Sequence, residues 1–308
     1  MASLFPARTA TRRPPATRDL LLVLNGRASG IHDPERLGTD LAARAQEMGA
    51  GADARITHSE PELWDALDEA ALSTKRVALV GGDGSLHAAA NAPLRALPEL
   101  ALIPAGRANN IARALGIPTK RGAALATAVS ATPRPLDALK VMTPMSSIYA
   151  VEGVSAGFHA EARSGYDAEN SADIKQGLLA LEQALLGYRP YEVRAVIDGA
   201  ATVAAGDAAQ LFLSNLPYFA YGFRVDPDAD PADGQLEAIL FHATRRTTLL
   251  RLLAAAHGGR HIGRPGVEVR SARTVELTEP IPLVADAVPL GTTTAAVTVE
   301  PARLQVAA

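Results

Sequence analysis

A glycine-rich turn with an aspartate and a serine is the segment of this sequence best suited to chemistry. The apolar run at residues 77–80 is followed by the letters GGDGS at residues 81–85, and His87 comes shortly after. Glycine lets backbone N–H groups approach an anion closely, and the N-terminus of a following helix strengthens that attraction. The turn therefore predicts phosphate binding, with a plain strand-to-helix turn capped by Ser85 as the alternative. It lacks the Gly-Lys-Ser/Thr of a P-loop and the Gly-x-Gly-x-x-Gly of dinucleotide sites.

Two further loops stand in the same kind of context. Residues 103–118 run from an apolar strand through a polar loop into a helix that Gly116 and Pro118 close. The polar loop at residues 25–30 follows the first apolar run. Loops that leave the same edge of a parallel sheet form the ligand crevice of open α/β folds. We therefore expect the three loops to line one site.

These loops belong to a pattern of alternating strands and helices in the first half of the chain. Strand candidates are residues 20–24, 54–57, 77–80 and 100–103. Asp33 suits the cap of a following helix, and Pro34 and Pro61 suit first helical turns. Mostly apolar strands separated by helices predict a Rossmann-like parallel α/β domain, with helices on both faces of the sheet.

After residue 140 the pattern changes to shorter strands separated by turns. Strand candidates are residues 191–197, 210–214, 236–241 and 273–277, and helix candidates are residues 173–186 and 247–256. We therefore expect a second domain that is β-rich, mostly antiparallel and sandwich-like.

Composition excludes several classes of protein. With 30 Lys and Arg against 33 Asp and Glu the net charge is −3, so no overall basic field indicates a nucleic-acid partner. The chain has no cysteine, which excludes disulfides, thiol nucleophiles and cysteine zinc sites. No apolar run predicts a membrane-spanning helix, so we expect a soluble, cytoplasmic protein. Residues 1–18 predict a disordered basic leader, with weak contact to anionic membranes as an alternative.

At these motifs the sequence resembles the lipid kinases built on the diacylglycerol kinase catalytic domain, including bacterial soluble lipid kinases, sphingosine kinases and ceramide kinases. Their Gly-Gly-Asp-Gly-Thr motif is matched by residues 81–85, and their Gly-Thr-x-Asn-Asp-Phe-Ala-Arg motif aligns with residues 106–113. Their Asn-Pro-x-Ser/Ala-Gly loop is matched loosely by residues 25–29. Residues 215–227 and 230–237 resemble a strand with a Gly-rich turn and the metal loop after it. The resemblance covers most of the chain beyond residue 18.

The resemblance implies an ATP-binding domain at residues 19–140, a β-rich substrate domain at residues 141–290, and a segment at residues 291–308 that returns to the first domain. The implied nucleotide-binding residues are Asn25, Gly26, Thr57, Gly81, Gly82, Asp83, Gly84, Ser85, Leu86, His87, Gly106, Arg107, Asn109 and Asn110. Arg107 replaces a family threonine and adds a guanidinium that can bind phosphate, with a solvated loop arginine as the alternative. The implied Mg²⁺ ligands are the Asp233 side chain and the carbonyl oxygens of Asp230 and Gln235, with a metal-free acidic turn as the alternative.

The sequence departs from the family at polar positions. The family's Asp-Gly-Glu motif aligns so that Val288 stands at the glutamate thought to take the substrate's proton, and valine cannot accept one. The other departures are Arg107, Asn110, Ala232 and the pair His87-Ala88. Two residues could supply the lost function. Asp286 would reach the cleft from an extended segment beside Val288, and His87 would act as a base with its near-neutral pKa.

The leading hypothesis is an ATP- and Mg²⁺-dependent kinase that phosphorylates a hydroxyl of a lipid or amphipathic alcohol, with diacylglycerol as the preferred type of acceptor. Its partners would be that acceptor and, transiently, a membrane surface, and a homodimer is a further assembly to consider. The alternatives are a pseudokinase that binds nucleotide or lipid without transfer, and a kinase for a soluble alcohol.

Overall fold

The first part of the chain alternates strands and helices, as the sequence predicts. The computed structural model describes residues 18–164, 174–220 and 222–308, so the predicted leader lies outside the described residues except for its last residue. The elements of this part are β1 (Arg18–Asn25), α1 (Pro34–Glu47), β2 (Ala52–Thr57), α2 (Glu60–Ser73), β3 (Thr74–Gly81), α3 (Asp83–Ala90), β4 (Glu99–Pro104), α4 (Asn110–Ala114) and α5 (Arg121–Ser130). Asp33 and Ser59 cap α1 and α2 by accepting backbone N–H groups. The strands pair in parallel in the order β2-β1-β3-β4, which confirms the predicted α/β domain.

The second part is β-rich, which confirms the other half of the predicted fold. Its elements are β5 (Pro133–Met142), β6 (Ser147–Ala150), β7 (Gly153–Gly157), α6 (Phe158–Ser164), α7 (Ile174–Gly187), β8 (Tyr191–Ile197), β9 (Ala201–Ser214), β10 (Leu236–His242), α8 (Arg246–His257), β11 (Val267–Ala272), β12 (Thr274–Ala285) and β13 (Val288–Ala307). All the strand pairs within this part are antiparallel.

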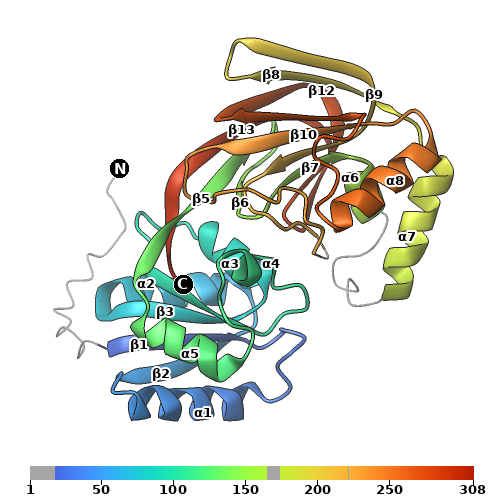
Figure 1. Cartoon of the computed structure of the whole chain (residues 1–308). Helices are drawn as coiled ribbons and strands as arrows, with labels where there is room; N and C mark the ends of the chain where they lie inside the picture. The colour runs from blue at the N-terminus through green and yellow to red at the C-terminus, as the bar shows by residue number, and fades with distance from the viewer. Residues whose placement is uncertain (1–17, 165–173, 221) are drawn as a thin grey trace, which may run out of the picture.

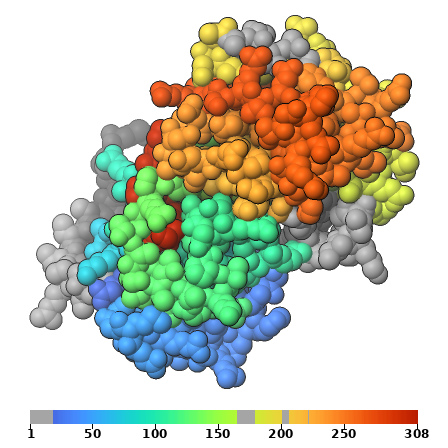
Figure 2. Space-filling model, viewed as in Figure 1, coloured from blue at the N-terminus to red at the C-terminus, as the bar shows by residue number. Residues whose placement is uncertain are grey.

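The last strand joins the two domains. β13 pairs with β12 and β5 along most of its length and then runs parallel to β4, where Val306 and Ala307 face Leu100 and Ala101. The strands therefore form one continuous 13-stranded sheet. Figure 1 shows β5 and β13 passing from the β-rich domain to the α/β domain. Figure 2 shows the red C-terminal end of the chain among the green atoms of the first domain.

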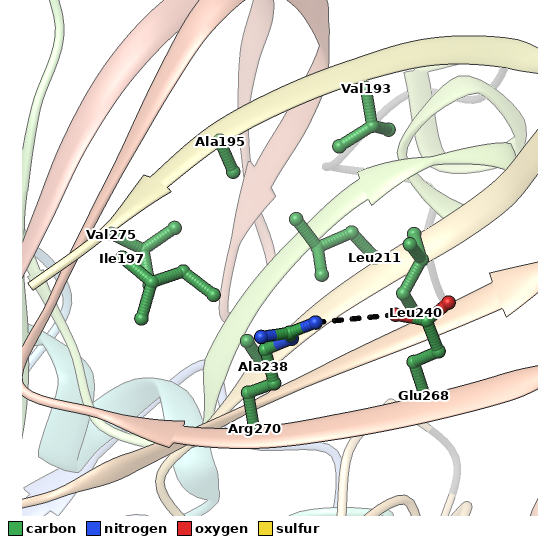
Figure 3. A pocket seen from close by; sticks show the side chains of 9 residues that line it. All are labelled: Val193, Ala195, Ile197, Leu211, Ala238, Leu240, Glu268, Arg270 and Val275. Carbon is green, nitrogen blue, oxygen red and sulfur yellow. Dashed lines mark ion pairs between the residues drawn. The ribbon is translucent and has the colours of Figure 1, made fainter. Parts of the chain in front are cut away.

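Within the described residues, three clusters of buried apolar side chains form the core. One fills the α/β domain, a second lies on one face of the β-rich sheet, and a third lies between the other face and α6, α7 and α8. The second cluster contains a small apolar hollow of about 20 Å³ between β8, β9, β10 and β12, with the Glu268–Arg270 ion pair at its rim (Figure 3). Such a volume holds about one water molecule, so the hollow is a packing gap and is too small for a lipid chain. No helix within the described ranges is both long and apolar enough to span a bilayer.

A histidine links three strands at one end of the β-rich domain. His242 follows a register shift at the end of β10. Its Nδ1 lies 2.8 Å from Asp207 Oδ1 on β9, and its Nε2 lies 3.0 Å from Glu268 Oε1 on β11. Burial alone would lower the pKa of His242, but the hydrogen bonds and negative charges of the two carboxylates outweigh it, so the pKa is raised. The doubly protonated ring can donate to both partners.

This arrangement predicts a pH-dependent contribution to stability. A histidine pKa that is raised on folding stabilises the protein fully below its unfolded pKa of about 6.5, and the contribution is lost as the pH rises through the folded pKa. We therefore expect His242→Gln to lower the free energy of unfolding by about 1 kcal/mol in mildly acidic solution and by less in alkaline solution. Denaturant unfolding of both proteins across this pH range measures the difference. The exposed His32→Gln is the control, and a cost at His242 that grows with pH would contradict the prediction.

Candidate functional site

A cleft of about 620 Å³ with a partly polar lining lies between the two domains. One wall comes from the loops at the carboxyl ends of β1, β3 and β4, where open α/β folds bind ligands. The other wall comes from the loop between β6 and β7, from α6, and from the turn between β12 and β13. The residues that line it are Asn25, Ala28, Ser29, Glu60, Gly82, Asp83, Gly84, Ser85, His87, Gly106, Arg107, Ala108, Glu152, His159, Arg163, Ala220, Asp286, Ala287 and Val288.

The two glycine loops predicted to bind phosphate lie against each other. A Cβ atom on Gly106 would stand 2.5 Å from Gly82 Cα, so the two backbones approach more closely than any side chain permits. Asn109 closes the second loop in a left-handed conformation with φ 48°, and its side chain accepts from Gly106 N and donates to Gly106 O. The glycines are therefore required by packing between the loops as well as being suited to an approaching anion.

Asp83 ties the first loop to the second. Its Oδ1 accepts the backbone N–H of Ile111 at 2.9 Å, at the start of α4. Burial raises the pKa of Asp83 although backbone hydrogen bonds from Ile111 and Asn110 lower it, and the nearby charge of Asp286 raises it further. Ser85 on the same turn lies 3.4 Å from the Asn25 amide, so the loop after β1 also joins the cluster.

A second hollow of about 260 Å³ adjoins the cleft and shares Asn25, Glu60, Gly84 and Ser85 with it. Thr57 lines this hollow rather than the cleft, and its hydroxyl donates to Leu24 O at 3.3 Å. The cleft and the hollow together follow the edge of the parallel sheet from β4 to β2.

Most of the predicted nucleotide-binding residues meet at these hollows. Asn25, Gly82, Asp83, Gly84, Ser85, His87, Gly106 and Arg107 line the cleft, and Thr57 lines the adjoining hollow. Gly26, Gly81, Leu86, Asn109 and Asn110 line neither. Leu86 is fully buried in the core, and a Cβ on Gly81 would stand 2.1 Å from Ser85 Oγ.

The structure brings together the two residues predicted to handle a proton. His87 Nδ1 lies 2.7 Å from Asp286 Oδ2 across the domain boundary. Burial alone would lower the pKa of His87, but its hydrogen bond to Asp286 and the charge of that carboxylate outweigh it, so the pKa is raised. The expectation that Asp286 lies in an extended segment is wrong. Asp286 has φ 50° and forms, with Ala287, the turn between β12 and β13.

Asp286 also holds the facing loop between β6 and β7. Its Oδ2 accepts the N–H of Val151, and its Oδ1 accepts those of Glu152 and Gly153, at 2.8 to 3.1 Å. With His87, each carboxylate oxygen accepts two hydrogen bonds. Two carboxylate oxygens offer about four lone-pair positions, so these four hydrogen bonds occupy all of them.

Glu152 is a functional candidate that the sequence analysis missed. It lines the cleft, its exposed fraction is 7%, and its Oε2 accepts the Asn110 amide at 3.0 Å. Burial raises the pKa of Glu152 well above its ordinary value, and the charges of Asp83 and Asp286 raise it further. The signal available in the sequence was a single carboxylate inside the otherwise apolar run at residues 150–154. Such a residue is costly to bury unless it is paired.

The remaining residues on this wall differ in charge. The pKa of the buried His159 is lowered to about 4 by burial and by Arg163, so His159 is neutral near pH 7. Arg163 therefore carries the positive charge on this wall, opposite Arg107. Val288 lines the cleft with 37% of its surface exposed, and it offers no group that could accept a proton.

The predicted metal residues lie in a separate loop. Asp230 Oδ1 accepts Ala232 N and Asp233 Oδ1 accepts Gln235 N, so both carboxylates hold the turn itself. Asp230, Asp233 and Gln235 do not line the cleft. Across the part of the chain that the structure describes, no three His, Asp or Glu side chains gather as a metal-binding group. The side chains therefore do not form a metal cage, and Mg²⁺ binding by this loop stays a prediction.

The fold and the site together define a two-domain α/β protein whose glycine loops face buried carboxylates across the domain boundary. Residues 19–141 match the family model described as diacylglycerol kinase catalytic domain, and residues 152–308 match the YegS C-terminal NAD kinase beta sandwich-like domain. A diacylglycerol kinase of Mycobacterium tuberculosis is 30% identical over 216 residues, which cover 67% of this chain and 68% of that protein.

Two further comparisons agree. The diacylglycerol kinase of Bacillus subtilis is 28% identical over 241 residues, 75% of this chain and 77% of that protein. The crystal structure of a diacylglycerol kinase from Bacillus anthracis has the same fold, with a TM-score of 0.70 over 94% of this chain and 96% of that chain at 16% identity. The chain belongs to the diacylglycerol kinase family of lipid kinases.

The close contact between the two glycine loops predicts a specific sensitivity to substitution. Gly106→Ala places a methyl group against Gly82 Cα, so the loops must separate, at a cost of about 1–3 kcal/mol. Thermal unfolding without ligand measures this cost. Gly122→Ala in α5 is the matched control, because its added Cβ lies 3.9 Å from the nearest atom and helices favour alanine. Equal melting temperatures for Gly106→Ala and the unsubstituted protein would show that the loops do not pack in this way.

Proposed function

We propose that this protein transfers the γ-phosphoryl group of ATP to a hydroxyl of a lipid or similar amphipathic alcohol, with a diacylglycerol-type acceptor preferred. The observation that carries the proposal is the cleft itself. In it the glycine loops and the N-terminal end of α3 face the buried carboxylates of the other domain. Family membership supports the same class of reaction.

On the α/β side, the backbone N–H groups of the glycine loops and Arg107 would bind the phosphates. A helix N-terminus and a guanidinium both favour anionic oxygens, and a Cβ added to Gly84, which lines the cleft, would meet no atom within 4 Å, so the backbone there is accessible. The adjoining hollow beside Thr57 and Asn25 has room for the rest of the nucleotide. Mg²⁺ would enter with ATP as part of the substrate and neutralise phosphate charge. Positioning and charge neutralisation account for most of the catalysis of phosphoryl transfer.

On the β-rich side, the small and apolar side chains of Ala220, Ala287 and Val288 leave space for an acceptor next to the phosphate loops. An acceptor with long acyl chains is supplied from a bilayer, so the protein would work from the cytoplasm through transient contact with a membrane surface. The proposal needs no nucleic-acid partner, and a homodimer is compatible with it.

One observation favours a second candidate. Val288 replaces the family's proton-accepting glutamate in the cleft wall, as would occur in a pseudokinase that binds nucleotide or lipid without transfer. Nucleotide binding without turnover would then be the function. A kinase for a soluble alcohol is the remaining alternative, since the glycine turn is common to several kinase classes.

The direct test is transfer of labelled γ-phosphate from MgATP to diacylglycerol, phosphatidylglycerol, sphingoid bases and soluble alcohols. We expect label in diacylglycerol. Asp83→Ala should lower kcat/KM on the order of 10²-fold, because it frees the first glycine loop from α4. Asp68→Ala, at an exposed position of α2, is the matched control and should leave transfer unchanged.

Two other outcomes of the transfer experiment would favour one of the alternative functions. Label only in a soluble alcohol would favour the soluble-substrate kinase. Absence of label in every acceptor, together with a rise in melting temperature on adding ATP, would favour the pseudokinase, because a ligand that binds only the folded state stabilises it.

A further inference from the structure

We propose that Glu152 is the catalytic residue that accepts the proton of the acceptor hydroxyl. The inference rests on the proposed kinase function and assigns the group that fills the role left open by Val288. The hydroxyl oxygen forms a bond to the γ-phosphorus while the bond from that phosphorus to the β,γ-bridging oxygen breaks. ADP leaves with that oxygen, and the hydroxyl proton passes to the Glu152 carboxylate.

The backbone around Glu152 is held in place from several sides. The N–H groups of Val151, Glu152 and Gly153 all donate to Asp286, and Glu152 O accepts the N–H of Asn215 and Leu216. Gly153, with φ 156°, lies so close to β9 that a Cβ would stand 2.5 Å from Leu213 O. The loop is therefore rigid, as a group that must meet a reacting atom requires.

The Glu152 side chain is fixed as well, and it faces the cleft. Asn110 donates its amide to Oε2 at 3.0 Å, and the N–H of Ala220 donates to the same carboxylate. Asn110 is itself held, because its amide also donates to Ala220 O. Glu152 thus lies on the wall opposite the glycine loops, where an acceptor hydroxyl and the terminal phosphate would meet.

The other titratable groups nearby are less suited to the role. Asp286 already accepts two hydrogen bonds on each oxygen, so a proton could bind it only by displacing one of them. His87 directs Nδ1 at Asp286, and its Nε2 lies 3.4 Å from the Asn91 amide. Asp83 Oδ1 already accepts a hydrogen bond from the backbone N–H of Ile111 in the first turn of α4. Asp286 and His87 then act as positioning residues for the Glu152 loop.

Burial and the surrounding charges make Glu152 a stronger base than an ordinary carboxylate. Asp83 on α3 and Asp286 on the β12–β13 turn raise its pKa in addition to burial, so its proton affinity exceeds that of an ordinary carboxylate. Arg163 on α6 is the basic group on the same wall of the cleft as Glu152, His87 on α3 and Arg107 after β4 are the basic groups on the opposite wall, and His159 on α6 is neutral. A base is most effective when its pKa lies near the working pH.

Glu152→Gln tests the assignment, because it keeps the shape of the side chain and removes its ability to take a proton. We expect kcat to fall about 10²–10⁴-fold, while the KM for ATP stays within about threefold. In the unsubstituted enzyme kcat should rise with pH as Glu152 ionises, and this rise should be absent from Glu152→Gln. Glu47→Gln, at an exposed position of α1, is the matched control and should change neither value.

A stability measurement separates this inference from the kinase proposal. A raised carboxyl pKa means that the folded protein binds the proton more tightly than the unfolded chain, so stability falls as pH rises from the unfolded pKa through the folded one. Glu152→Gln removes this pH-dependent loss of stability, because the glutamine side chain does not ionise. We expect its melting temperature to exceed that of the unsubstituted protein in alkaline solution, and the excess to shrink as the pH is lowered.

The outcomes are distinct. If the unsubstituted enzyme transfers phosphate and Glu152→Gln keeps its kcat and pH profile, Glu152 is not the base and the kinase proposal stands. If His87→Gln removes the pH-dependent rise and Glu152→Gln does not, the proton goes to His87. If the unsubstituted protein phosphorylates no acceptor although the melting-temperature difference shows that Glu152 titrates, the kinase proposal fails, and the assignment of Glu152 as its base fails with it.

Discussion

The carboxylate of Asp286 is the interaction on which the rest of the site depends. It sits in a tight turn of the β-rich domain, bonds to His87 of the α/β domain, and accepts three consecutive N–H groups from the loop between β6 and β7. Asp286 adopts a left-handed conformation that aspartate tolerates better than most residues. One side chain therefore fixes the distance between the two walls of the cleft and orders the loop that carries Glu152.

This arrangement places three carboxylates, those of Asp83, Glu152 and Asp286, around one cleft. Burial raises the pKa of Asp83 and Glu152, and the charge of Asp286 raises both further, so folding would favour a neutral group at either position. Perturbed titratable groups gathered in a cleft are typical of functional sites. The two walls of the cleft are joined by the continuous sheet, in which β13 pairs with strands of both domains.

The sequence was sufficient to predict the fold and the loops that line the α/β side of the cleft. The alternation of apolar strands with capped helices is a local pattern, and the glycine turns at Gly82 and Gly106 follow directly from where those strands end. The closeness of these two turns could not be predicted, because it depends on how β3 and β4 pair. Asp286 was identified as a candidate, but its place in a turn depends on the pairing of β12 with β13.

The sequence analysis did not identify Glu152, for a related reason. Glu152 is a candidate base because Asn110 holds its side chain and Asp83 and Asp286 raise its pKa. These three residues are distant from Glu152 in sequence and approach it only in the folded structure. A carboxylate in an apolar run gives a weak signal on its own, since its partners are set by tertiary structure. The same holds for the metal loop, where the pattern of aspartates is visible but their hydrogen bonds to the turn are not.

The decisive measurement for the roles of the glycine turn and of Glu152 is a structure determined with a non-hydrolysable ATP analogue and a short-chain diacylglycerol. We expect the terminal phosphate at the glycine turn of residues 81–85 and the acceptor hydroxyl within about 2.6–3.2 Å of the Glu152 carboxylate. A hydroxyl directed at His87, or an acceptor bound outside the cleft, would contradict it.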